Sequence, residues 1–218
     1  MIPSSSRGSS TRSCARGRRA RTRCSASSWA RPWRAPGPAP SGGSSCPARS
    51  VGQAERVFEG AIFAVERLLG PEAGRPYDVV RHPGAAAVLP VTPGGDVLLV
   101  EQLRPAIGDR LVEIPAGLLD RPGEDALACA ARELFEETGY RHTAIGFLGG
   151  IYTTAGFTDE YVHLFWALTE AEPFAEPEAG IVLRREPFAA MVRAARAGRV
   201  RDAKTALALL MAEGRPPP

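Results

Sequence analysis

Three glutamates, Glu133, Glu136 and Glu137, stand close together in the sequence. Residues 124–138 around them have helical periodicity, and Gly139 follows at a position where helices commonly end. At 100° per residue, the three carboxylates fall within about 100° of one another on that helix. Their mutual repulsion destabilises the helix by a few tenths of a kcal/mol per pair, and a divalent cation with oxygen ligands would offset it. The pattern therefore indicates a metal-binding helix face, although three glutamates alone also occur on ordinary solvated faces.

The rest of the helix is expected to serve packing and charge balance. Arg132 supplies one positive charge beside the three carboxylates, and Glu124 lies about 180° from Glu133 on the helical wheel. We therefore expect Glu124 to orient Arg132 and not to bind metal. The side expected to pack in the core holds Leu127, Ala131, Leu134, Phe135 and Thr138.

Several strands and two further helices must hold this helix in place. The apolar runs 85–91 and 97–101 flank Thr92-Pro93-Gly94-Gly95-Asp96, which predicts a hairpin. The strands and helices do not alternate regularly, so we expect an α+β fold with helices packed on a mixed sheet. Strands are also predicted around Gly60 and at 110–114, 145–152, 160–168 and 181–185, a loop at 169–180, and helices at 187–196 and 201–213.

The composition divides the chain into two parts. Residues 1–50 contain ten Arg and no Asp or Glu, so the net charge of +3 leaves −7 on residues 51–218. An acidic domain argues against a nucleic-acid-binding surface, and an acidic enzyme acting on phosphates needs cations to bridge the two. The sequence contains no run of eighteen apolar residues, so no membrane-spanning helix is predicted. Cys14, Cys24, Cys46 and Cys129 show no metal-binding spacing, so we expect a reducing, cytoplasmic location.

The segment 1–50 is rich in Ser, Arg, Pro, Gly and Ala, and we expect it to be disordered. Three interpretations of this segment are open: a basic arm, an organellar transit peptide, or translated non-coding DNA upstream of the true start. The dominance of residues typical of a GC-rich genome favours the third interpretation. The predicted domains are therefore 1–50, a disordered segment, and 51–218, the folded domain.

The residues 132–140, RELFEETGY, match the second half of the Nudix box, R-E-(apolar)-x-E-E-x-G-(apolar), at every position. Glu124 precedes Arg132 by eight residues, as the box requires. Six residues separate Gly117 from Glu124 where the box has five, and the extra residue falls in the loop before the helix. The chain thus resembles the Nudix hydrolases. Flanking strings over about residues 55–213 resemble their ADP-ribose (ADP-sugar) pyrophosphatase branch; these are Phe58-Glu59-Gly60, His82-Pro83-Gly84-Ala85, Glu101-Gln102-Leu103-Arg104 and Glu113-Ile114-Pro115-Ala116-Gly117.

The resemblance implies a Nudix fold, in which a loop–helix–loop packs against a mixed β-sheet sandwiched by helices, preceded by small antiparallel N-terminal strands. It implies that Mg²⁺ or Mn²⁺ is held by Glu133 and Glu137, with Glu136 close and the Ala116 carbonyl completing the ligand set. The cations would support attack of water on a diphosphate. The implied activity is hydrolysis of a nucleoside diphosphate sugar, foremost ADP-ribose, to AMP and ribose 5-phosphate.

The resemblance also implies further residues around the substrate. A glutamate on the loop after the box would accept the proton from the attacking water. Glu176 and Glu178 are the candidates there, and the distance to the following helix favours Glu178. Arg104 would face the diphosphate or adenosine, Glu113 would line the cleft, Gly156 would let the backbone approach the ligand, and Phe63 of a partner subunit would stack on adenine. Members of the branch are usually homodimers with exchanged N-terminal strands.

One departure bears on the substrate. The branch usually carries Ser-Pro-Gly where this chain has Thr154-Ala155-Gly156. The alternatives are therefore a Nudix pyrophosphatase for a GDP-sugar, a dinucleotide polyphosphate, NADH or an oxidised nucleotide, and an ADP-ribose sensor without activity. Sensors usually lose box carboxylates, whereas Glu133, Glu136 and Glu137 are all present here.

Overall fold

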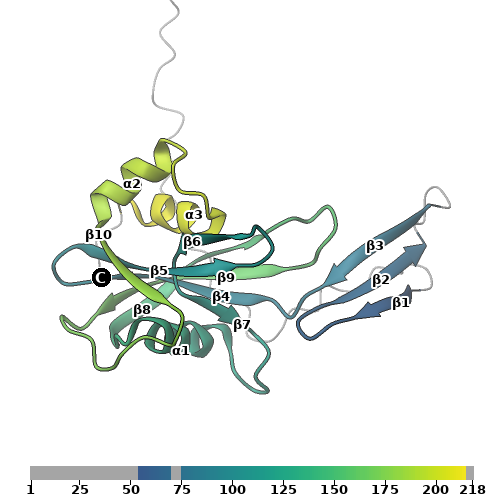
Figure 1. The fold of residues 1–218 in the computed structure, drawn as a ribbon, viewed down its shortest axis with the longest axis horizontal. Coiled ribbons are helices and arrows are strands. Elements are labelled where there is room, and N and C mark those ends of the chain that lie inside the picture. Colours follow the sequence, from purple (N-terminus) through teal and green to yellow (C-terminus); the bar gives the residue numbers. More distant parts are fainter. Residues whose placement is uncertain (1–53, 70–74, 215–218) are drawn as a thin grey trace, which may run out of the picture. The chain divides into compact units, whose positions relative to one another are not determined.

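The structure is a computed structural model that describes residues 54–69 and 75–214. The expectations for residues 1–50 lie outside this range. Two sheets and three helices make up the described part (Figure 1). No helix among these residues is long and apolar enough to cross a membrane.

The first sheet is small and antiparallel. Its strands, in the order β1-β2-β3, are β1 (Ala54–Glu59), β2 (Ala64–Leu69) and β3 (Pro76–Arg81). Gly60 begins the turn between β1 and β2, where its N–H donates to the Phe63 carbonyl at 2.9 Å. The sequence predicted short strands on either side of Gly60, and the structure corrects their limits, because Phe63 lies in the turn itself and not in a strand.

The second sheet is mixed, as predicted, because β4 pairs in parallel with β9 and all other pairs are antiparallel. Its central order is β10-β5-β4-β9-β8, with β6 beside β5 and β7 beside β4. The strands are β4 (Ala85–Val91), β5 (Asp96–Arg104), β6 (Asp109–Glu113), β7 (Ala116–Leu118), β8 (His142–Tyr152), β9 (Tyr161–Thr169) and β10 (Val182–Pro187). The predicted β4–β5 hairpin is present, and β3 and β7 are strands that the sequence did not predict.

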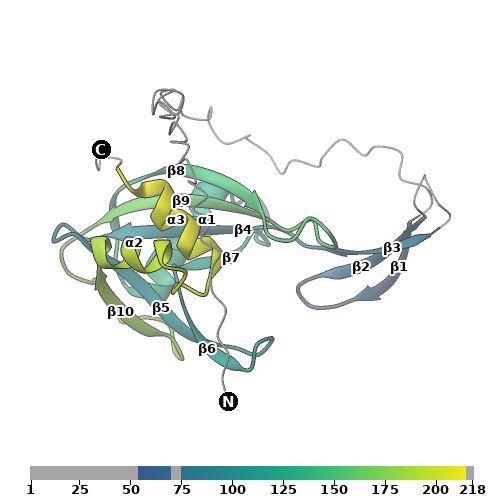
Figure 2. The same cartoon turned by 90° about the horizontal axis from the view of Figure 1, so that it is seen from above.

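Helices cover both faces of this sheet. Helix α1 (Ala126–Thr138) lies on one face, and α2 (Phe188–Arg196) and α3 (Ala203–Ala212) lie side by side on the other (Figures 1 and 2). Because side chains alternate along a strand, β4 serves both layers: Ala86 and Val88 pack towards α1, whereas Ala87 and Leu89 pack towards α2 and α3. The expected α+β architecture of helices on a mixed sheet is therefore confirmed.

Helix α1 has well-defined ends. The Asp125 carboxylate caps its start by accepting from the Ala128 N–H at 2.8 Å. Gly139 ends it with φ 75°, a left-handed conformation that favours glycine, and its N–H donates to the Phe135 carbonyl. These two caps fix the register of the residues that carry the carboxylates.

The buried side of α1 agrees only in part with the expected one: Leu134 and Thr138 are buried as predicted, whereas the expectation for Leu127 is wrong. Leu127 is 43% exposed, while Glu137 is only 6% exposed. The buried residues are Cys129, Ala130, Leu134, Glu137 and Thr138. The helix is rotated in this way because its inner side packs on β4 and β7 together, and the short β7 strand covers the position of Glu137.

Candidate active site

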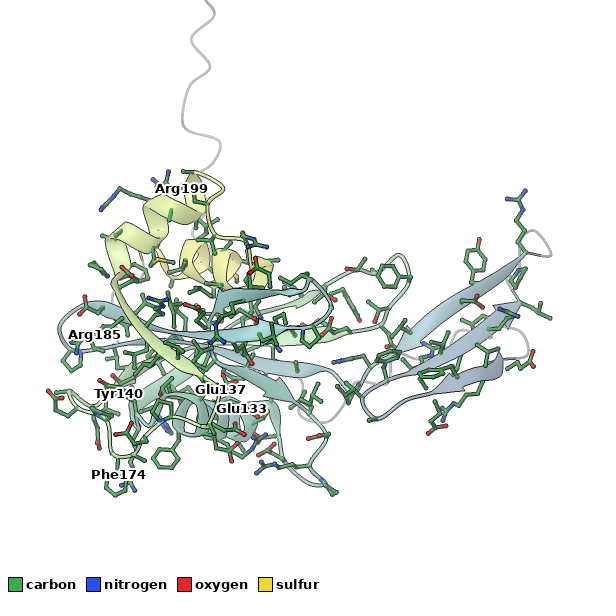
Figure 3. The ribbon with its side chains drawn as sticks, in the orientation of Figure 1. Glu133, Glu137, Tyr140, Phe174, Arg185 and Arg199 are labelled. Carbon is green, nitrogen blue, oxygen red and sulfur yellow. The ribbon has the colours of Figure 1, made fainter. Side chains whose placement is uncertain are left out.

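The carboxylates of Glu133, Glu136 and Glu137, here called the box carboxylates, lie where α1 meets β7. The β7 strand pairs with β4 through Ala86↔Gly117 and Ala87↔Ala116, which places the backbone of Ala116 and Gly117 beside the helix. Glu133 and Glu137 point into this junction from one turn of α1 (Figure 3). Glu136, on the same turn, is more exposed and pairs with Arg121 at 3.4 Å and with Arg132.

Glu137 is held against the backbone of β7. Its Oε2 accepts the Ala116 N–H at 3.0 Å. Burial raises the pKa of Glu137 to about 7; the Ala116 N–H opposes this shift, and the negative charge of Glu133 adds to it. A buried carboxylate with so little compensating charge is a natural ligand for a cation.

Glu133 occupies a space that only glycine at position 117 leaves open. A Cβ on Gly117 would lie 1.8 Å from the Glu133 Oε1 and 2.7 Å from its Cγ. Burial raises the pKa of Glu133, against the opposing effect of Arg132. The glycine of the box therefore makes room for a carboxylate, in spite of the extra residue in the following loop.

Arg132 balances the charge of the cluster. Its guanidinium donates to both oxygens of Glu124, at 2.7 and 2.9 Å, and also contacts Glu133 and Glu136. The pairing of Glu124 with Arg132 that the helical wheel suggested is therefore present. As they stand, no three His, Cys, Asp or Glu side chains within 54–69 and 75–214 converge closely enough to hold an ion. Of the three glutamates at positions 133, 136 and 137, Glu133 and Glu136 pair with Arg132 instead.

The donor set nevertheless suits a hard divalent cation. Glu133 and Glu137 offer carboxylate oxygens from one helix turn, and Ala116 brings its backbone to the same junction. Carboxylate and carbonyl oxygens are the ligands that Mg²⁺ and Mn²⁺ prefer. Nearby Cys129 is buried, and burial raises the pKa of its thiol to about 12, so it offers no thiolate ligand.

Arg104 ends β5 close to these carboxylates. The Glu113 carboxylate raises the pKa of Arg104, and the charge of Glu137 acts in the same sense. Glu113 itself is 1% exposed, and both its oxygens are engaged, by Arg104 and by Lys204. Glu113 thus holds Arg104 and Lys204 in place, and its expected position in the lining of the cleft stays a prediction.

The loop between β9 and β10 is fastened to the C-terminal end of α1. The Gly139 carbonyl accepts the N–H groups of Phe174 and Ala175, at 2.8 and 3.3 Å, and the Glu136 carbonyl accepts that of Glu178 at 2.9 Å. The Arg141 guanidinium lies 3.6 Å from the centre of the Phe174 ring. The structure thus brings the backbone of Glu178 next to Glu136. The side chains of Glu176 and Glu178 are both exposed.

Two expected substrate residues are not joined to the carboxylates by any hydrogen bond or ion pair among the described residues. Phe63 is 41% exposed and packs on Phe58, with ring centres 5.9 Å apart. Gly156 lies in the β8–β9 turn, and nothing stands within 4 Å of where its Cβ would be. That turn is tied to β3 instead, through the Val80 N–H and the Phe157 carbonyl at 2.7 Å.

A pocket of about 380 Å³ opens on the other face of the sheet, between β5, β10 and α2. Leu99, Met191 and Arg199 contribute to its lining, and none of the box carboxylates does. Figure 3 shows Arg199 far from Glu133 and Glu137. The box carboxylates therefore lie at the α1–β7 junction and not in this pocket.

Two residues that contact the surroundings of the site were not predicted from the sequence. Lys204 reaches Glu113, 91 residues away, and Arg141 holds the β9–β10 loop. The Asp202-x-x-Thr205 pattern does signal a helix start, and Asp202 caps α3 as that pattern predicts. No local pattern indicates which strand that helix meets.

Comparison with known proteins places the chain in a family. The NUDIX domain matches residues 80–207. A GDP-mannose pyrophosphatase of Cronobacter sakazakii is 34% identical over 174 residues, which cover 71% of this chain and 90% of that protein. The chain therefore belongs to the Nudix family, and the carboxylates of α1 are those of its characteristic box.

Two further relatives carry another name. An ADP-ribose pyrophosphatase of Bacillus subtilis is 42% identical over 118 residues, 52% of this chain and 62% of the relative. An ADP-ribose pyrophosphatase of Mycobacterium tuberculosis is 40% identical over 128 residues, 57% of this chain and 61% of the relative. These matches thus span about three-fifths of the length of each relative.

Proposed function

We propose that this protein hydrolyses the pyrophosphate bond of ADP-ribose, giving AMP and ribose 5-phosphate, with Mg²⁺ or Mn²⁺ as cofactor. The observation that carries the proposal is the junction of Glu133 and Glu137 with the backbone of β7, beside Arg104. Buried carboxylates on one side and an arginine on the other suit a metal-bound diphosphate. The relatives named ADP-ribose pyrophosphatase support the choice of substrate.

In the proposed mechanism, Glu133, Glu137 and the Ala116 carbonyl would hold the metal, with Glu136 close. A bound divalent cation would neutralise the diphosphate and polarise its phosphorus–oxygen bonds. Arg104 binds a phosphate oxygen and so helps to align the bond that breaks. Glu178, or Glu176 in the same loop, accepts the proton of the attacking water, and Arg132 with Glu124 keeps Glu133 and Glu136 in position.

The remaining parts of the proposal concern assembly and place. Phe63 would stack on the adenine held by a partner subunit, and Gly156 would allow the backbone to approach the ligand. Exposed apolar side chains of the β1–β3 sheet and of its first turn, including Val57, Phe58 and Phe63, support a homodimer formed through this sheet. Light scattering of the purified protein tests the dimer, and a monomer at micromolar concentration would exclude it. We further propose a cytoplasmic location, with no nucleic-acid or membrane partner.

A second candidate substrate is GDP-mannose. The relative named for it matches over 90% of its length, more than the other two relatives do. Ala155 also stands where the ADP-ribose branch usually has proline. The chemistry would be the same at the carboxylates, and only the base and the sugar would differ.

A substrate panel with Mg²⁺ and an EDTA control decides between them. The panel contains ADP-ribose, ADP-glucose, GDP-mannose, NADH, diadenosine polyphosphates and oxidised dGTP, and chromatography identifies the released mononucleotide. Preferential release of AMP from ADP-ribose supports the proposal. Preferential release of GMP from GDP-mannose supports the second candidate. Binding of ADP-ribose without turnover of any compound would contradict both and favour a sensor.

Glu137→Gln provides the matching test of the site. The substitution preserves shape but removes the negative charge of a buried metal ligand, so turnover should fall below about a thousandth of the original value. The melting temperature of the metal-free protein should not fall, because the amide no longer has to be ionised in a buried position. An active and fully folded variant would exclude Glu137 as a metal ligand.

A further inference from the structure

Lys204 is the only lysine in the chain, and it lies in the first turn of α3. Its ammonium group donates to the Glu113 carboxylate and, at 3.0 Å, to Asp202. The Lys204 side chain is 16% exposed and that of Glu113 2%. A buried ion pair contributes little net stability, because desolvation opposes the attraction between the charges. Its position next to the proposed active site therefore calls for another explanation.

Glu113 lies between two cations. The Arg104 Nε donates to its Oε1 at 2.6 Å and the Arg104 Nη2 to its Oε2 at 2.9 Å, and Lys204 contacts that same Oε2. Burial opposes the ionisation of Glu113, but its two ion pairs outweigh that effect and hold its pKa below the ordinary value. Glu113 is thus a fixed negative charge that orients the fork of Arg104.

The Arg104 guanidinium leaves one nitrogen, Nη1, without a hydrogen bond among the described residues. Its side chain is 40% exposed, which makes it accessible to an anion. Arg104 and Glu137 also affect each other's pKa through their charges, so the guanidinium lies within electrostatic reach of the box. Arg104 therefore has one side held by Glu113 and another available to a phosphate.

Lys204 is itself held firmly. Asp202 caps α3 by accepting the Thr205 N–H at 2.9 Å, and the Thr205 hydroxyl accepts the Ile114 N–H at 2.8 Å. The start of α3 is thereby fixed to the chain that follows β6. Lys204 offsets the negative charge of Glu113, so that Arg104 keeps its full attraction for the diphosphate while Glu113 still sets its orientation.

We propose that Lys204 is a positioning residue for the diphosphate, acting through Glu113 on the charge and orientation of Arg104 and not by touching the substrate. Only the kinetic test of this inference depends on the proposed function. A purely structural role, in which Lys204 only fastens α3, predicts a loss of stability without any coupling to Arg104.

A double-mutant cycle separates the two roles. Lys204→Met keeps the length of the side chain and removes its charge, and it should raise KM for ADP-ribose roughly tenfold, the size expected for coupled side chains. Lys204→Arg should restore most of the affinity. In an Arg104→Gln background, Lys204→Met should have no further effect on KM. Arg201→Met serves as control. Arg201 is an exposed cation two residues before α3, and it pairs with Asp109 and not with Glu113 or Arg104.

A second measurement does not depend on turnover. Because the chain has one lysine, labelling the full-length, tag-free protein with ¹³C-lysine gives a single Cε signal in an NMR spectrum. Inorganic pyrophosphate with Mg²⁺ should shift this signal in the original protein and leave it in place in Arg104→Gln. Lys204→Met should weaken pyrophosphate binding by a similar factor of about ten.

The possible outcomes are distinct. Additive effects of Lys204→Met and Arg104→Gln on KM, or equal pyrophosphate affinity with and without the Lys204 charge, would overturn the inference. If ADP-ribose is not hydrolysed but the pyrophosphate response depends on both residues, the proposed substrate fails and the role of Lys204 stands.

Discussion

Glu137 is a carboxylate buried beside a backbone N–H, and its environment determines how the metal-free protein should respond to pH. Its pKa in the folded chain is about 7, compared with an ordinary value of 4.5. The folded state therefore keeps a proton that the unfolded chain releases near pH 4.5. As pH rises from 4.5 to 7, the free energy of unfolding therefore falls, because the unfolded chain releases this proton and the folded chain keeps it. Above pH 7 both states have lost the proton, and Glu137 lowers the free energy of unfolding no further.

The melting temperature of metal-free protein should accordingly fall between about pH 5 and pH 7 because of Glu137. Thermal unfolding in EDTA over this range, compared with Glu137→Gln, isolates the contribution of this residue. Mg²⁺ should restore the melting temperature at pH 8 in the original protein and have little effect in the variant. The same pH dependence in both proteins would contradict the assignment.

Gly117 permits a second prediction for a single residue. Alanine there would displace the Glu133 carboxylate, because its Cβ would meet that group at 1.8 Å. A displacement of about 1 Å at a catalytic group can cost roughly a hundredfold in rate, so we expect Gly117→Ala to lose activity on that scale. Gly94→Ala is the matched control, because its Cβ would meet its nearest neighbour at an ordinary 3.5 Å. Unchanged kcat/KM in Gly117→Ala would show that the position of Glu133 is not critical.

At the scale of elements, the end of α1 and the β9–β10 loop form one unit. A Cβ on Gly139 would lie 1.8 Å from the Ala175 carbonyl oxygen, so the loop passes directly over the helix end. The same loop carries Glu178, whose N–H bonds to the carbonyl of Glu136. The helix that carries the proposed metal ligands therefore also positions the loop of the proposed base.

Gly139→Ala should both destabilise the protein and lower kcat. The left-handed φ of 75° costs about 1 kcal/mol for alanine, and overpacking against the loop adds about 1–3 kcal/mol. Gly95→Ala is the control, because Gly95 has a similar φ of 83° and open space around it. Urea unfolding and steady-state kinetics measure the two effects. Equal losses of stability in both variants would show that the loop yields to the added methyl group.

Elements with a strong local pattern were predictable, and those defined by distant partners were not. The turn at Gly94-Gly95 and the stop at Gly139 marked the β4–β5 hairpin and α1. The strand β7 was not predicted, because three residues are too few to show a periodic pattern. This strand lies against Glu137 and helps to bury it. Burial of Glu137 and exposure of Leu127 could not be read from a helical wheel, because the wheel shows which residues share a side and not which side meets the sheet.

The candidate site follows the same rule. The carboxylates of residues 133–137 and their partner Arg132 could be recognised from spacing within one helix. The supporting role of Glu113 could not, since it depends on Lys204 at a separation of 91 residues and on the way α3 meets β6. Contacts of that length depend on the fold of the entire domain.

At the scale of the whole molecule, one mixed sheet supports two layers with different tasks. The α1 layer holds the carboxylates, and the α2–α3 layer closes the larger part of the core. Through Lys204, the second layer also reaches the proposed active site. Stability of the α3 helix and affinity for the diphosphate are therefore expected to change together.

The proposed active site and the core of the described residues both lie within residues 54–214, so we expect the segment 1–50 to be dispensable. Its Arg-, Ser- and Pro-rich composition offers little apolar surface to bury. A chain beginning at Val51 should keep the melting temperature within about 2 °C and kcat/KM within about twofold, because a segment of this composition is expected to contribute little to the free energy of unfolding. Scanning calorimetry and kinetics of both chains test this. A large loss of either quantity would show that the segment belongs to the enzyme.

The loop before α1 has a consequence for evolution and engineering. Its Gly123 has φ 81° and nothing within 4 Å of where a Cβ would be, and the loop ends at the cap residue Asp125. An extra residue is tolerated there because both ends of the loop are anchored, by Gly117 against Glu133 and by the cap of the helix. A search pattern with a fixed gap would reject this chain, although its carboxylates are in register. The same loop is a suitable point for inserting a short epitope or a fluorescent label next to the site without shifting the helix.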